Sequence, residues 1–92
     1  MPPSIGLDGM AKNELDLEAE EFLDRVSSNV VKARKAKGFS QLQLATEMGY
    51  KSASYLGRIE IRSDGQHFHL AQLYKIAKIL NIDVKDLLNT KD

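Results

Sequence analysis

The stretch from Ser40 to Glu60, SQLQLATEMGYKSASYLGRIE, decides the fold of this chain. Ser40 followed by Gln43 is the pattern of a capping box, in which each side chain bonds the other residue's backbone N–H at the start of a helix. Gly49 then offers the positive φ that ends a helix in a left-handed residue. The pattern predicts a first short helix between Ser40 and Gly49, followed by a tight turn.

A second short helix is expected after that turn, with Ser52 at its N-cap. Leu56 and Ile59 lie three residues apart, so both fall on one buried face of this helix. The residues expected to face mostly outward are Ser52, Ala53, Ser54 and Arg58. A helix that presents small polar groups and a cation, and that a second helix supports from behind, suits the major groove of DNA.

This pair of helices resembles the helix-turn-helix of the phage repressor and Cro type, which the wider XRE-like family shares. The matching positions are Gln41, Ala45, Gly49, Leu56, Ile59 and Glu60. The resemblance covers residues 26–88, and it departs from the family in one respect, an additional turn residue at Tyr50 or Lys51. It implies an all-α fold: a compact bundle of about five helices, a lambda-repressor-like domain with an N-terminal helical extension.

The resemblance also implies one structural contact. In the family, a glutamate at the end of the second motif helix pairs with an arginine on the helix that precedes the motif. Glu60 and Arg34 occupy these two places, since Arg34 stands shortly before the helix-ending Gly38. We therefore expect a structural ion pair between Arg34 and Glu60.

The charges of the chain are segregated along its length. Thirteen basic and thirteen acidic residues cancel over the 92 residues. Residues 8–24, however, hold seven acids against Lys12 alone, whereas residues 29–62 hold seven bases and two acids. Such segregation is typical of a protein with one phosphate-facing side, although a solvated face also explains a charge run.

The N-terminal part divides into two segments. Residues 1–12 contain two prolines and two glycines, which predicts a flexible arm. Residues 13–37 lack Gly and Pro and repeat apolar residues at helical spacing, which predicts one long helix, or two with a bend near Ser27 and Ser28. We expect residues 13–92 to form the helix-turn-helix domain. Residues 13–25 would be its acidic helical extension, which contacts a second copy, contacts a partner protein or only increases solubility.

The part after Glu60 is predicted to hold a loop and two helices. Residues 61–69 form the surface loop, and its His67 and His69 are too few to make a metal site without further ligands. Apolar residues then recur at helical spacing up to Asn81, and Asp83 is a suitable cap for a last short helix.

Several classes of protein are disfavoured by what the sequence lacks. Without Cys it has no disulfide scaffold and no thiolate metal site. It has no Gly-rich phosphate loop, nucleophile elbow or His-Glu metal motif. No apolar run is long enough to cross a bilayer or to act as a signal peptide. We therefore expect no enzyme activity, catalytic residue, metal, cofactor or membrane contact, and a cytoplasmic, nucleoid-associated protein.

The predicted function is sequence-specific regulation of transcription. A homodimer of repressor or controller type would insert helix 52–60 into the major groove of double-stranded DNA at a two-fold operator. Two alternatives remain. An antitoxin would bind a toxin through its acidic extension and bind its own promoter, and a protein-docking module would not bind DNA.

The expected DNA contacts divide by their role. Contacts to phosphates should come from Gln41, Lys51, Tyr55, Arg58 and Arg62. Contacts to base edges should come from Ser52, Ala53 and Ser54. Gly57, which costs about 1 kcal/mol in a helix interior, predicts a close approach of the helix backbone to DNA.

Overall fold

Five α-helices and one short 3-10 helix form within residues 4–91. The computed structural model describes residues 4–91, with side chains from residue 13 onward. The elements are α1 (Ser4–Ala36), α2 (Gln41–Glu47), α3 (Ala53–Glu60), η1 (Ser63–Gly65), α4 (Leu70–Leu80) and α5 (Val84–Leu88). Because no strand forms among residues 4–91, the predicted all-α fold is confirmed.

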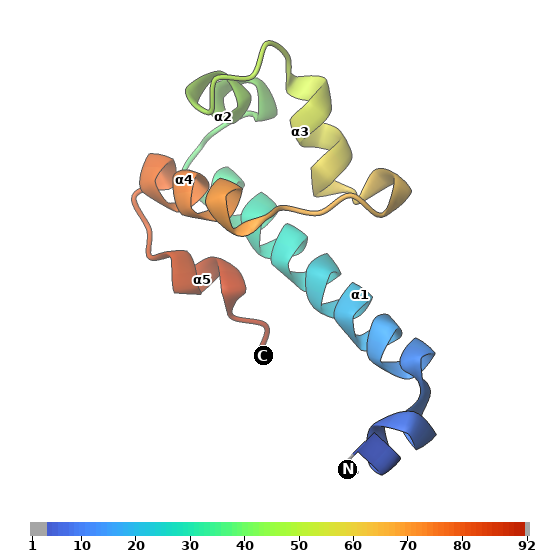
Figure 1. Ribbon diagram of the computed structural model, residues 1–92. Coiled ribbons are helices and arrows are strands. Elements are labelled where there is room, and N and C mark those ends of the chain that lie inside the picture. The colour runs from blue at the N-terminus through green and yellow to red at the C-terminus, as the bar shows by residue number, and fades with distance from the viewer. Residues whose placement is uncertain (1–3, 92) are drawn as a thin grey trace.

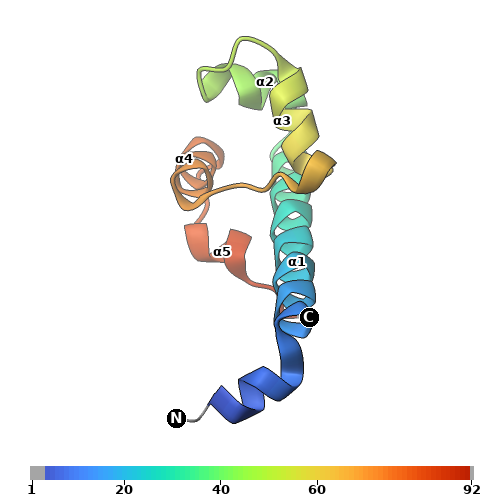
Figure 2. The ribbon, with the colours of Figure 1, turned by 45° about the vertical axis from the view of Figure 1, so that its right-hand side comes forward.

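The long helix α1 is the axis on which α3, α4 and α5 pack, and α2 packs on α3 and α4 (Figure 1). In two views, α2 to α5 gather along its C-terminal half, and its N-terminal part extends beyond them (Figures 1 and 2). The molecule is elongated as a result, with principal extents of 48 × 26 × 21 Å. The helix passes Ser27 and Ser28 without interruption, so the alternative of one helix is the one observed.

The start of α1 differs from the expectation. The helix begins at Ser4, so residues 4–12, which we expected in a flexible arm, have helical backbone; residues 1–3 of that arm lie outside the described residues. Extending an existing helix adds one hydrogen bond for each residue that is fixed, so Gly6 and Gly9 lower its stability without ending it. The boundary after residue 12 is therefore not marked by a change of secondary structure.

One hydrophobic core joins all five helices, and it includes the buried Phe68 from the loop before α4. Its members are Val26, Val30, Leu44, Ala45, Leu56, Ile59, Phe68, Leu73, Ile76, Ala77, Leu80 and Leu87. The end of α5 is held on α1 by Asn29, whose Nδ2 donates to the carbonyls of Leu87 at 2.9 Å and Asn89 at 2.8 Å. This core gives α3 a fixed support from behind.

The corners around α2 form as the sequence predicts. Ser40 Oγ accepts the N–H of Gln43 at 3.0 Å, and Gln43 Oε1 accepts the N–H of Ser40 at 2.7 Å, which completes the capping box. Gly38 and Gly49 have φ values of 77° and 84° after α1 and α2. Since only glycine adopts these values without strain, the two glycines set the angles between α1, α2 and α3.

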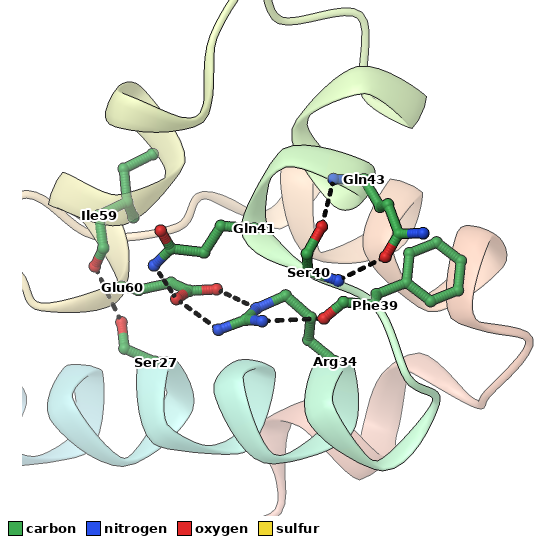
Figure 3. Close-up of polar contacts among 8 residues, drawn as sticks. All are labelled: Ser27, Arg34, Phe39, Ser40, Gln41, Gln43, Ile59 and Glu60. Carbon is green, nitrogen blue, oxygen red and sulfur yellow. Dashed lines mark hydrogen bonds and ion pairs between the residues drawn. The ribbon is translucent and has the colours of Figure 1, made fainter.

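A buried ion pair connects α1 with α3 (Figure 3). Arg34 Nε donates to Glu60 Oε2 at 2.8 Å and Nη2 donates to Oε1 at 3.1 Å. The two side chains are 8% and 3% exposed. Arg34 Nη1 also donates to the carbonyl of Phe39 at 2.9 Å, and Gln41 Nε2 donates to Glu60 Oε1 at 2.9 Å. The pair thus joins α1, the start of α2 and the end of α3.

Removing the charge of Glu60 tests this connection. Glu60→Gln leaves the Arg34 guanidinium buried without a counter-charge, so we expect the free energy of unfolding in urea to fall by about 3–5 kcal/mol. Glu47→Gln, at an exposed position on α2, is the matched control and should change it by less than about 0.5 kcal/mol. An unaltered urea midpoint for Glu60→Gln would show that the pair is not structural.

Candidate nucleic-acid interface

The outer face of α3 and the turn before it present small polar side chains and two cations. Leu56 and Ile59 are buried against the core, whereas Lys51, Ser52, Ser54 and Arg58 are exposed. Ala53 is half-buried, and Tyr55 is 37% exposed. The structure therefore brings five of the eight expected DNA contacts onto one short segment, from Lys51 to Tyr55, with Arg58 one turn further along α3.

The two serines at the start of α3 interact with each other. Ser52 occupies the N-cap position with extended backbone, but its side chain makes no capping bond. Its Oγ lies 3.0 Å from Ser54 Oγ instead. Since this bond uses one hydroxyl hydrogen, the pair keeps one hydrogen and several lone pairs for an external partner.

Gln41 is placed differently from the expectation, because part of its side-chain amide is used inside the protein. Its Nε2 bonds Glu60, and the amide lies over Gly57, where an added Cβ would stand 3.4 Å from Gln41 Oε1. Such a distance is an ordinary van der Waals contact, so Gln41 packs against Gly57 without requiring glycine there. The backbone N–H of Gln41 remains among the first N–H groups of α2, which have no partner within their helix.

Arg62 does not lie on the outer face of α3, which corrects its expected role as a phosphate contact. Its guanidinium donates to the carboxylates of Glu20 at 2.7 Å and Asp24 at 3.0 Å. The carbonyls of Glu20, Gly65 and Gln66 accept its other three hydrogens at 3.0 to 3.1 Å. All five donors of the arginine are thus occupied, so Arg62 joins the loop after α3 to the acidic part of α1.

The backbone and the charge of Arg62 fit this internal role. Its φ and ψ of 56° and 40° are left-handed, which turns the chain sharply after α3. Desolvation lowers the pKa of Arg62, but the hydrogen bonds and charges of Glu20 and Asp24 outweigh it and raise the pKa above its ordinary value. The arginine is therefore a permanent cation of the fold.

Tyr50 and Gln72, which lie beside α3, were not expected to belong to this region. Tyr50 and Tyr55 meet edge to face with ring centroids 5.0 Å apart, and both hydroxyls lie near the side chain of the buried Gln72. The sequence signal for Tyr50 was only that it stands in the turn. Gln72 carried no signal, because its partners are 17 and 22 residues away along the chain.

The loop before α4 does not provide a metal site among the described residues. No group of three or more potential metal-binding side chains occurs in the part of the chain whose side chains are described. The backbone N–H of His69 donates to Gln72 Oε1 at 2.9 Å, so His69 begins α4. No helix within the described range has the length and apolar character needed to cross a membrane.

A comparison with protein families agrees with this geometry. Residues 30–87, well over half of the chain, match the helix-turn-helix family HTH_3. The chain belongs to this XRE-type family of DNA-binding helix-turn-helix regulators. No curated protein and no solved structure matches the chain significantly.

The internal role of Arg62 can be separated from DNA binding by substitution. We expect Arg62→Ala to lower the free energy of unfolding in urea by about 1–3 kcal/mol, mostly through the three lost carbonyl bonds, because water screens the two exposed carboxylates. The salt dependence of DNA binding should not change. If Arg62→Ala reduced that salt dependence and left the urea midpoint unaltered, Arg62 would be a DNA contact.

Proposed function

We propose that this protein is a sequence-specific transcription regulator of repressor or controller type, which inserts α3 into the major groove of a two-fold operator. The observation that carries the proposal is the division of α3 into two faces. One face is buried and fixed by the Glu60 ion pair, and the other begins with the small exposed side chains of Ser52 and Ser54. A rigid helix whose first turn is small and polar fits closely against base edges.

The proposed contacts follow the exposure of each residue. Ser52, Ala53 and Ser54 face the bases, where the hydroxyls donate or accept and the alanine methyl meets a thymine methyl. Lys51 and Arg58 contact the phosphates on either side, and the backbone N–H of Gln41 donates to a further phosphate. None of the three base-facing residues makes a bidentate contact, so DNA shape contributes to the specificity.

The distribution of charge supports this orientation. The exposed cations Lys35 and Lys37 lie at the C-terminal end of α1, near α2. The acidic part of α1 lies at the opposite end of the molecule (Figure 1). A negatively charged duplex would be attracted to the first end and repelled by the second, which orients the protein as it approaches.

The apolar side chains on the N-terminal part of α1 support a homodimer. Leu15, Leu17 and Phe22 are 41%, 63% and 42% exposed. Leu15 and Phe22 are seven residues apart, so they lie on the same face of the helix as the buried Val26 and Val30. We propose that a second copy covers this continuation of the core-facing stripe, since two-fold symmetry of the protein matches a two-fold operator.

The same segment favours a second candidate function, that of an antitoxin. Exposed leucines among the acids of residues 13–24 fit a basic partner protein with an apolar groove. Such a chain would bind its toxin with this segment and its own promoter with α3. Purification of the chain with the product of a neighbouring small gene would distinguish this candidate from a stand-alone regulator.

Selection of bound fragments from random DNA provides the operator with which the contacts are tested. We expect Arg58→Ala to lower affinity for all sequences alike and to reduce the salt slope by about one unit, because one phosphate contact is lost. Ala53→Gln and Ser54→Ala should change which operator is preferred. If Arg58→Ala had no effect while changes at Lys35 and Lys37 abolished binding, the DNA face would lie on α1.

Deletion of residues 1–17 tests the role of the N-terminal part of α1, which extends beyond the other helices. The deletion removes Leu15 and Leu17 but keeps Glu20 and Asp24, so the contacts of Arg62 remain. We expect weaker dimerisation in sedimentation velocity and a small change in the urea midpoint. An unchanged sedimentation profile together with unchanged DNA affinity would make the segment a solubility tail.

A further inference from the structure

Gln72 connects the two tyrosines beside the start of α3. It lies in the first turn of α4 and is 5% exposed. Its Oε1 accepts the backbone N–H of His69 at 2.9 Å. Its Nε2 lies 2.9 Å from the hydroxyl oxygen of Tyr50 and 3.4 Å from that of Tyr55. One buried amide therefore serves two phenols from the turn and from the helix that follows it.

The direction of these hydrogen bonds is determined by chemistry. A backbone N–H only donates, so the oxygen of the Gln72 amide must face His69, and its nitrogen must face the tyrosines. Each phenol oxygen then accepts a hydrogen from Gln72 and directs its own hydrogen elsewhere. Neither phenol hydrogen has an acceptor within residues 13–91. Both hydroxyls, on the half-buried Tyr50 and on Tyr55, thus keep their hydrogens for an acceptor from outside the protein.

We propose that Tyr50 and Tyr55 together donate to DNA phosphates, and that Gln72 is the positioning residue that keeps both hydroxyls as donors. This inference rests on the proposed function. Phosphate oxygens only accept hydrogen bonds, whereas base edges present donors as well, so two fixed donors suit a phosphate. A cleft of about 350 Å³ has Tyr55, Arg58 and Asp64 among the residues of its wall, so Tyr55 borders the same surface as the cation of Arg58.

Removal of single hydroxyl groups tests the contact without changing the packing of the rings. DNA affinity is measured by fluorescence anisotropy of the full chain, with the selected operator and with unrelated DNA, for Tyr50→Phe, Tyr55→Phe and the double variant. We expect each single change to lower affinity about three- to tenfold on both DNAs. The salt slope should not change, because a neutral donor releases no counterion. Tyr74→Phe, 56% exposed on α4, is the matched control and should have no effect.

Gln72→Glu tests the positioning role. The carboxylate still accepts the N–H of His69, but it replaces the donor that faces the tyrosines with an acceptor, so the phenol hydrogens turn inward. We expect a loss of affinity in the wild-type background at least as large as that of the double tyrosine variant. In the double-variant background the loss should be much smaller, because only the effect of the added charge remains.

The outcomes separate this inference from the function on which it rests. A wild-type chain that selects no DNA would overturn the proposed function and the inference with it. A wild-type chain that binds DNA with unchanged affinity after both tyrosine changes would overturn the inference alone. A loss from Gln72→Glu of the same size in both backgrounds would overturn the positioning role. A lowered urea midpoint with unaltered affinity would show that the hydroxyls only stabilise the fold.

Discussion

The buried carboxylate of Glu60 is the group on which the arrangement of the helix-turn-helix depends. It accepts two hydrogen bonds from Arg34 and one from Gln41, and Arg34 also bonds the carbonyl of Phe39 in the turn before α2. A buried ion pair is tolerated only when its hydrogen bonds are satisfied, so any shift of α2 or α3 relative to α1 would be costly. The ion pair thus fixes the position from which α3 presents its outer face.

The structural elements that the sequence predicted correctly are those that depend on residues close together along the chain. The capping box at Ser40, the glycines at the ends of α1 and α2, and the cap of α5 each depend on residues within a few positions of one another. Spacing of apolar residues likewise gave the buried face of α3. These local signals, together with the family resemblance, were sufficient for the all-α fold and for the exposure of Lys51, Ser52 and Ser54.

The side-chain roles that sequence reasoning missed depend on distant partners. Arg62 follows a basic segment, which favoured a phosphate contact, but Glu20 and Asp24 are 42 and 38 residues away and occupy it. Gly57 was interpreted from its cost in a helix, whereas the side chain that lies against it is Gln41, 16 positions earlier in the sequence. Neither relation has a periodicity or a spacing that a single sequence reveals.

These distant contacts also change which forces remain for binding DNA. Of the bases in residues 29–62, Arg34 and Arg62 are used inside the protein, so the cations left for phosphates beside α3 are chiefly Lys51 and Arg58. The same region is rich in hydroxyls, from Ser52, Ser54 and the two tyrosines. Neutral hydrogen bonds depend on geometry and are little affected by salt. Contacts between cations and phosphates, in contrast, form with any DNA sequence. We therefore propose that recognition by this face relies on a fixed pattern of hydroxyl groups, for which the rigidity supplied by Glu60 and Gln72 would be needed.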